Sequence, residues 1–158
     1  MFPIRMLRMQ DIGSDTAEEA DRLYTDSFPT AERFPLELMH GLDGSMGARF
    51  MCYTDEGRFV GITFTIETDD YLFLNFLAVE EELRGKGYGS EILGILREES
   101  GKPLFLNMEP VTDDCDNPEQ RVRRRDFYLR NGFRENGLSV TPDGNTFMGM
   151  VSGEPIPL

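Results

Sequence analysis

The sequence predicts a mixed α/β (α+β) fold, with a sheet of six or seven strands flanked by helices. Short apolar runs separated by Gly and Asp turns indicate strands, and amphipathic stretches between them indicate helices. The chain has 158 residues, of which 39% are hydrophobic, which is enough for one sizeable core and short for two. We therefore expect one domain over residues 1–151 and a C-terminal tail over 152–158.

The first half of the chain predicts a strand, two helices and a hairpin. Ala17, Ala20, Leu23 and Tyr24 recur at helical spacing within the first helix. The hairpin turns at Asp55-Glu56-Gly57, a short Gly-containing loop. The predicted elements are a strand over 4–9, helices over 14–27 and 35–40, and strands over 49–54 and 58–68.

The second half predicts a crossover followed by another helix and hairpin. Residues 71–79 are apolar at nearly every position, a pattern typical of a strand buried on both faces. A helix follows the glycines near residue 87, and its connection to the next strand should make a parallel, right-handed crossover. The remaining elements are a strand over 103–109, a helix over 118–131 that ends at Gly132, and strands over 133–140 and 146–152.

Composition excludes several classes of protein. The net charge of −13 is opposite to that of a nucleic-acid-binding surface and favours cationic partners such as amines. No window is long and apolar enough to span a membrane, and the N-terminus lacks the pattern of a signal peptide, so we expect a cytoplasmic protein without a membrane partner. Cys52 and Cys115 lie far apart and form no CxxC pattern, so neither a disulfide framework nor a metal site is expected.

The stretch 82-ELRGKGYGSEILGIL-96 has three closely spaced glycines directly before an apolar-striped helix. Backbone amides at a helix N-terminus point outward, and the helix dipole favours negative charge there, so the stretch predicts a phosphate site. It lacks the spacing of a Walker A loop. Ser90 stands where a dinucleotide GxGxxG motif requires its third glycine. The pattern that remains is Arg84-x-x-Gly87-x-Gly89; the alternative is a plain glycine-rich turn with solvated charges.

These residues resemble the GCN5-related N-acetyltransferase (GNAT) superfamily, whose pyrophosphate loop reads Arg/Gln-x-x-Gly-x-Gly/Ala between a strand and a helix. The segment 126-DFYLRNGF-133 resembles the aromatic-Tyr-x-x-x-Gly-Phe segment of the same family, so the similarity covers residues 71–133. The resemblance implies a GNAT-like acyl-CoA N-acyltransferase fold. It also implies an enzyme that transfers an acetyl group from acetyl-CoA to a primary amine of a small molecule, peptide or protein.

The resemblance implies two groups of cofactor-binding residues. The strand end that hydrogen-bonds the pantetheine arm corresponds to Leu77, Ala78 and Val79, and the pyrophosphate loop corresponds to Arg84, Gly85, Lys86, Gly87, Tyr88, Gly89 and Ser90. Physical chemistry agrees with this expectation. Glycines remove side chains where amides approach phosphate oxygens, and Arg84 and Lys86 add positive charge.

Acyl transfer to an amine requires one proton to leave the amine and another to reach the departing thiolate. The resemblance implies Tyr128 as the acid; the alternative is a tyrosine that packs in the core. Many relatives place a Glu where Asn107 stands here. Glu109 is the nearest carboxylate and is our candidate base, acting through a water, although a surface position is nearly as plausible.

The acceptor side is less defined. Glu32 lies between the first two helices, a region that commonly borders the acceptor site in this family, and we expect it and Asn107 to contact the substrate. A cap or a pair with Arg33 is the alternative for Glu32. The acidic loop 110-PVTDDCDNP-118 would attract a cationic acceptor. A CoA-binding regulatory module without turnover is the alternative function, and the sequence leaves open whether the chain forms a homodimer.

Overall fold

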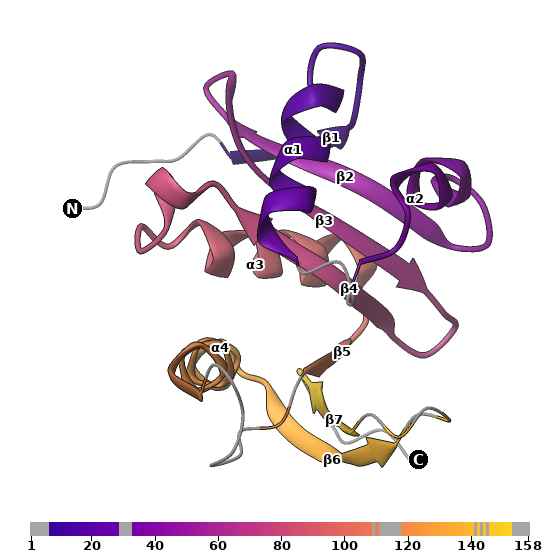
Figure 1. Cartoon of the computed structure of the whole chain (residues 1–158), viewed down its shortest axis with the longest axis vertical. Helices are drawn as coiled ribbons and strands as arrows, with labels where there is room; N and C mark the ends of the chain where they lie inside the picture. The colour runs from indigo at the N-terminus through magenta and orange to yellow at the C-terminus, as the bar shows by residue number, and fades with distance from the viewer. Residues whose placement is uncertain are drawn as a thin grey trace.

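A computed structural model of the chain describes residues 7–28, 33–108, 110, 118–140, 142, 144 and 146–152 (Figure 1). It contains one seven-stranded sheet with the order β1-β2-β3-β4-β5-β7-β6, which confirms the predicted mixed sheet flanked by helices. The strands are β1 (Leu7–Asp11), β2 (Ala48–Asp55), β3 (Arg58–Glu67), β4 (Leu72–Val79), β5 (Leu104–Met108), β6 (Arg134–Val140) and β7 (Thr146–Val151). The helices are α1 (Ala17–Ser27), α2 (Leu36–Leu42), α3 (Tyr88–Ser100) and α4 (Pro118–Arg130), with a 3-10 turn η1 (Glu81–Leu83) before α3.

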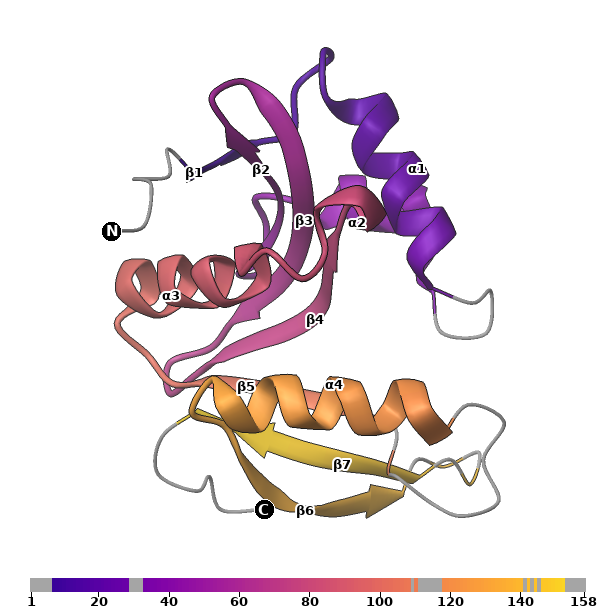
Figure 2. The same ribbon diagram turned by 90° about the vertical axis from the view of Figure 1, so that its left-hand side faces the viewer.

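The helices divide between the two faces of the sheet. Figure 2 shows α1 and α2 on one side of the β1–β4 half and α3 on the other, with α4 over the β5–β7 half. Two hydrophobic clusters follow this division. One includes Leu93 and Tyr128 of α3 and α4, and the other includes Leu23 and Met39 of α1 and α2. The helices therefore bury their apolar stripes in two cores separated by the sheet.

The predicted pairings agree with the observed sheet. β2 and β3 form an antiparallel hairpin whose turn residues, Glu56 and Gly57, both have positive φ values of 51° and 83°. β4 and β5 are parallel and joined through α3, as a crossover requires. The terminal hairpin folds back so that β7, rather than β6, pairs with β5. The start of the predicted strand over 4–9 and most of the predicted tail lie outside the described residues.

Burial along β4 differs from the expectation of two fully buried faces. Leu72, Leu74, Phe76 and Ala78 are buried, whereas the residues between them are only half-buried. The half-buried positions include Phe73, and they border the cavities described below. An apolar strand pattern alone could not distinguish side chains that pack in a core from side chains that line an open cleft.

The helices are short. α3 and α4 have 13 residues each, and α1 has 11. A helix that crosses a bilayer needs about 20 apolar residues. Within the part of the chain that the structure describes, no helix combines the length and apolar character needed to span a membrane.

Candidate active site

The parallel strands β4 and β5 separate soon after they meet. They pair only at Leu72–Leu104 and Phe73–Phe105, whereas the other edge of β4 pairs with β3 as far as Val79. The second half of β4 therefore presents an edge toward β5 that β5 does not cover. An uncovered strand edge can hydrogen-bond an extended ligand that carries amide groups.

A β-bulge lies in the middle of β4. Phe64 pairs with Phe76 and the next residue, Thr65, pairs with Leu74, so Asn75 is left without a partner in the register. A bulge of one residue reverses which side chains face each side of the sheet. Consistent with this, Leu74 packs in the α3/α4 cluster, but Phe76, two residues later, packs in the α1/α2 cluster. The bulge thereby directs the side chain that follows Phe76 toward the α3/α4 side.

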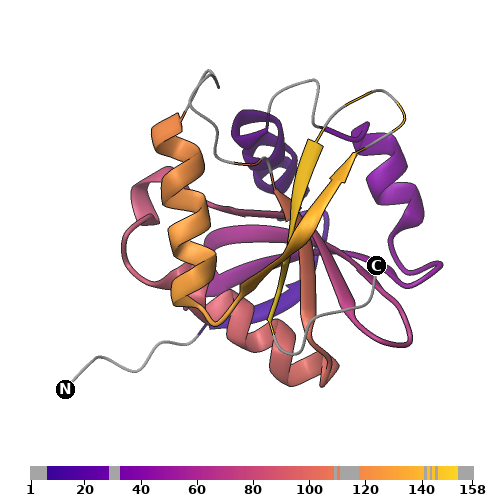
Figure 3. The same ribbon diagram turned by 90° about the horizontal axis from the view of Figure 1, so that it is seen from below.

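A cleft of about 710 Å³ opens between the end of β4, the start of α3 and the cleft-facing side of α4. Its lining combines segments that are far apart in sequence, and Figure 3 shows α4 lying beside α3. The lining residues are Ser27, Phe28, Leu77, Ala78, Val79, Leu83, Arg84, Gly85, Gly87, Tyr88, Gly89, Ser90, Gln120, Arg123, Arg124, Phe127, Tyr128 and Arg130. Nine of the ten predicted cofactor-binding residues thus line one cavity; Lys86 is exposed beside it and is not in the lining.

The loop before α3 depends on two glycines with left-handed backbone conformations. Gly85 and Gly87 have φ values of 77° and 86°, and Gly87 occupies the N-cap position. A residue with a Cβ is strained in this region, so glycine allows the abrupt change of direction into the helix. No side chain caps α3 in its first turn. The positive end of the helix dipole therefore faces the cleft, where an anion would be stabilised.

Gly89 has a different structural role from the one that the sequence suggested. A Cβ at this position would lie 2.9 Å from Cζ of Phe127, closer than side-chain atoms normally approach. The absence of a side chain therefore allows the first turn of α3 to pack directly against α4. Gly89 sets the width of the cleft by helix packing, and Gly87 sets the course of the loop.

The charge of the cleft contrasts with that of the whole protein. Four arginines line it, Arg84, Arg123, Arg124 and Arg130, and no carboxylate occurs among the described lining residues. The chain as a whole has a net charge of −13. This concentration of guanidinium groups suits a ligand with several phosphates. The sequence does not mark Arg123 or Arg130 as site residues, because only the position of α4 turns them toward the cleft.

The Tyr128 side chain is 9% exposed and reaches the cleft from α4. Its ring packs at an angle against Phe127 and Phe133, with centroids 5.1 Å and 5.2 Å away. Burial raises the pKa of the Tyr128 phenol above its usual value, and the nearby Arg124 guanidinium offsets part of this shift. The phenol is therefore protonated at neutral pH and can donate a proton to a ligand in the cleft.

A second, smaller pocket of about 250 Å³ adjoins the cleft, and Phe28 and Arg124 contribute to both. It occupies the space where β4 and β5 separate, and Asn107 of β5 lies in its lining. Asn75 Oδ1 is buried and has no hydrogen-bond partner among the described residues. An unpaired buried polar atom costs about 1–3 kcal/mol, so such a group in a cavity wall indicates a place for a ligand. The lining residues are Phe28, Phe34, Phe73, Leu74, Asn75, Phe76, Asn107, Met108, Arg124 and Phe147.

The predicted site residues thus divide into three groups. The loop, the end of β4 and Tyr128 come together around the cleft, and Asn107 lies in the adjoining pocket. Glu109 and Glu32 lie outside the described residues, as does most of the acidic loop. The pocket residues Asn75 and Phe34 were missed; only the bulge in β4 could have drawn attention to Asn75, and a bulge has no clear signal in this sequence.

Comparisons with known proteins agree with this geometry. A family profile described as acetyltransferase (GNAT) domain matches residues 46–135, which are 90 of the 158 residues. A protein of Bacillus subtilis (strain 168) that is named as an acetyltransferase, YjbC, is 32% identical over 108 residues. That alignment covers 66% of this chain and 54% of YjbC, so the chain spans about half the length of the curated relative it matches.

Solved structures share the fold. A GNAT-family protein of Bacteroides thetaiotaomicron, named as an acetyltransferase, superimposes with a TM-score of 0.76 at 23% identity, covering 93% of this chain and 87% of the other. An aminoglycoside 6′-N-acetyltransferase in complex with coenzyme A superimposes with a TM-score of 0.64 at 15% identity, covering 96% and 99% of the two chains. The same arrangement of strands and helices therefore accommodates coenzyme A in another protein.

Proposed function

Because the chain belongs to the acetyltransferase (GNAT) family, we propose that it transfers an acetyl group from acetyl-CoA to a primary amine of a small molecule or of a peptide or protein. The observation that carries the proposal is a single cleft that holds a phosphate-binding loop, four arginines and a protonated phenol. These are the groups that a pyrophosphate-bearing thioester requires for binding and for departure of its sulfur.

Three features of the cleft fit coenzyme A. The loop from Arg84 to Ser90 and the start of α3 suit the pyrophosphate, and Arg123 and Arg130 of α4 add positive charge to the same cleft. The uncovered edge of β4 suits the amide groups of the pantetheine arm. The hydroxyl of Ser27 borders the cleft and is buried without a hydrogen-bond partner among the described residues, so a polar group of the ligand would satisfy it.

Bound acetyl-CoA supplies an activated acyl group as a thioester. The protein then has to manage two protons. Tyr128 Oη holds its proton at neutral pH, so it is in the form that can donate a proton to the departing sulfur.

An alkylammonium with a pKa near 10 must lose a proton before it attacks, which costs about 4 kcal/mol at pH 7. We propose Glu109 as the group that accepts this proton, through a water. Glu109 follows Asn107 by two residues, and Asn107 borders the pocket beside the cleft. Glu109→Gln should lower kcat/KM for the amine more than it weakens acetyl-CoA binding, and unchanged kinetics would assign the proton to water or another group.

The deciding experiment measures thiol release from acetyl-CoA with a panel of amines, including amino acids, polyamines, aminoglycosides and peptides. Amine-dependent release that produces an N-acetylated product supports the proposal. A protein that binds CoA but releases no thiol with any acceptor would instead be a regulatory module. Tyr128 argues against that second function, because a module that only binds CoA has no need of a protonated phenol in the cleft.

A further inference from the structure

We propose that the acceptor is an amine that carries both a carboxylate and an apolar, preferably aromatic, side chain, of which a free apolar amino acid is the simplest example. This inference rests on the proposed function and specifies the substrate class of the same site. It depends on three features of the smaller pocket: a wall of phenylalanines, an amide oxygen without a partner, and a guanidinium at its junction with the cleft.

The pocket is lined by five phenylalanines, Phe28, Phe34, Phe73, Phe76 and Phe147. Three of them are held by contacts with one another and with Tyr24. Phe76 packs edge-on against Phe28 and Phe34, with centroids 4.9 Å and 5.3 Å apart. The hydroxyl of Tyr24 accepts a hydrogen bond of 2.6 Å from the backbone N–H of Phe34 and donates one of 3.0 Å to its carbonyl. The aromatic wall is therefore preorganised for an apolar group.

The charge in the pocket opposes a polycationic acceptor. Among the described lining residues there is no carboxylate, and the one charged group is Arg124. A polyamine or aminoglycoside would bring several ammonium groups beside this guanidinium, which repels them. The acceptor that matches the lining has a single amine, which loses its proton for the reaction, and an anionic group for Arg124.

Arg124 is available to bind that anionic group. Its guanidinium makes no hydrogen bond or ion pair with the described residues, and it borders both the pocket and the cleft. Arg124 precedes Tyr128 by four residues on α4, so the two side chains leave the same face of the helix about 6 Å apart along its axis. A carboxylate held by Arg124 would place an α-amine close to the position of the thioester sulfur.

Asn75 lies on the opposite wall. Its Oδ1 is buried, has no partner within the described part of the chain, and comes from the bulge where β4 leaves the register of β3. An amine donates hydrogen bonds, so this oxygen can accept one from the attacking nitrogen and orient it. The three contacts together fix the amine, the carboxylate and the side chain of an amino acid.

The test compares kcat/KM for acceptors that differ by one feature, at saturating acetyl-CoA. L-Phenylalanine and L-phenylalaninamide differ in the carboxyl group, which is charged in one and a neutral amide in the other, and are compared at the same concentration of neutral amine; L-phenylalanine and glycine differ in the side chain. We expect L-phenylalanine to exceed the amide and glycine by about tenfold or more each, the range expected for losing one charged contact or one apolar side chain. Spermidine should be the poorest acceptor.

Two variants test the Arg124 contact and the aromatic wall separately. Arg124→Gln should abolish the preference for L-phenylalanine over its amide, and any effect of this variant on acetyl-CoA binding cancels because it applies to both acceptors. Phe147→Ala should abolish most of the preference over glycine. Leu138→Ala is the matched control, since Leu138 is 58% exposed on the neighbouring strand β6 and lies outside the pocket. It should leave both ratios unchanged.

The outcomes distinguish a wrong acceptor class from a wrong proposed function. Rapid acetylation of spermidine or an aminoglycoside with no activity on L-phenylalanine overturns the inference and leaves the proposed function intact. Retention of the acid-over-amide preference in Arg124→Gln also overturns it. Calorimetry with N-acetyl-L-phenylalanine and CoA adds a readout without turnover. Binding that Arg124→Gln abolishes supports the pocket assignment even if no acceptor releases thiol, whereas no binding together with no turnover overturns it.

Discussion

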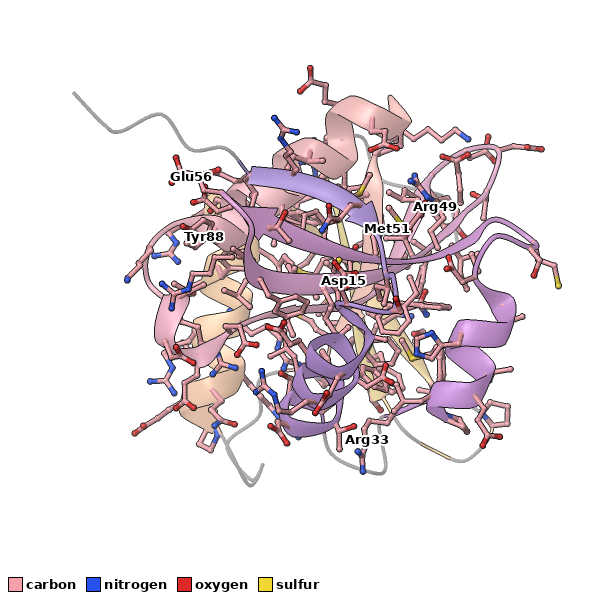
Figure 4. All side chains as sticks on the ribbon, turned by 90° about the horizontal axis from the view of Figure 1, so that it is seen from above. Asp15, Arg33, Arg49, Met51, Glu56 and Tyr88 are labelled. Carbon is pink, nitrogen blue, oxygen red and sulfur yellow. The ribbon has the colours of Figure 1, made fainter. Side chains whose placement is uncertain are left out.

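The phenol of Tyr88 donates a hydrogen bond of 2.6 Å to Oδ2 of Asp55. Tyr88 is the first residue of α3 and borders the cleft, and Asp55 is the last residue of β2. Figure 4 shows Tyr88 near the β2–β3 turn, where Glu56 is labelled. This bond connects the start of α3 to a hairpin more than 30 residues earlier, so the loop before α3 is held by the sheet as well as by its own glycines.

We expect Tyr88→Phe to lower the free energy of unfolding by about 1–2 kcal/mol, because the bond joins a hydroxyl to a carboxylate near the surface. Urea denaturation of Tyr88→Phe, Asp55→Ala and the double variant measures the coupling. If the two single effects simply add, the hydrogen bond does not stabilise the protein. The dissociation constant for CoA should also rise in Tyr88→Phe, since the start of α3 would be less firmly positioned.

Gly87→Val should abolish the rise in melting temperature that CoA produces in the unmodified protein. The φ value of 86° at Gly87 is costly for any residue with a Cβ and most costly for a β-branched one. Gly87→Asn is the matched comparison, because asparagine tolerates this conformation better. A normal CoA-induced shift in folded Gly87→Val protein would remove the loop from the site.

Gly89→Ala and Gly94→Ala test the packing of α3 on α4 within one helix. A Cβ at Gly89 would lie 2.9 Å from the Phe127 ring, but one at Gly94 would meet no atom within 4 Å. We expect Gly89→Ala to lower the free energy of unfolding by about 1–3 kcal/mol. Gly94→Ala should raise it by up to about 1 kcal/mol, because alanine favours the helix. Equal effects would contradict a packing role for Gly89.

Tyr128→Phe removes one hydroxyl and keeps the ring that packs against Phe127 and Phe133. If the phenol protonates the departing sulfur, kcat should fall by about 10²-fold or more, with little change in acetyl-CoA affinity or melting temperature. Steady-state kinetics with the best acceptor and a CoA titration measure both quantities. Turnover within about threefold of the unmodified enzyme would refute the role of general acid.

The buried phenols predict the response to alkaline pH. Burial raises the pKa of Tyr128, Tyr53 and Tyr24 above the unfolded value of about 10. A raised pKa means that the folded state favours the neutral phenol. The corresponding stability is complete below about pH 10 and is lost as the pH rises through the folded pKa values. Thermal unfolding between pH 8 and 11.5 should show this loss, and Tyr128→Phe should reduce it.

The raised pKa of Tyr128 also affects how activity depends on pH. kcat/KM for the amine should rise between about pH 6 and 8.5 as the amine or its base loses a proton. No fall caused by Tyr128 should occur below about pH 10, because its pKa lies above the ordinary value. A fall near pH 8 that disappears in Tyr128→Phe would show that the phenol titrates far below this expectation.

The sequence by itself determined the order of elements and the glycine loop before α3. Residues such as Leu93 and Leu96 mark α3 by helical spacing, and Gly85 and Gly87 mark its abrupt start, because both signals depend on neighbours along the chain. The aromatic segment around Tyr128 predicted a helix beside the loop, and α4 does line the same cleft. These local signals sufficed for the fold class, since apolar periodicity and turn chemistry act within a few residues.

Only the tertiary structure decided how wide the cleft is, which arginines line it and which residues border the smaller pocket. The bulge at Asn75 and the early separation of β4 from β5 depend on how whole strands pair with one another. No local sequence pattern encodes this pairing. The contact of Gly89 with Phe127 joins residues 38 positions apart. The distance between α3 and α4 depends on how the two cores pack against one sheet. For the same reason, Arg124 and Phe147 come to line one pocket only when the chain folds.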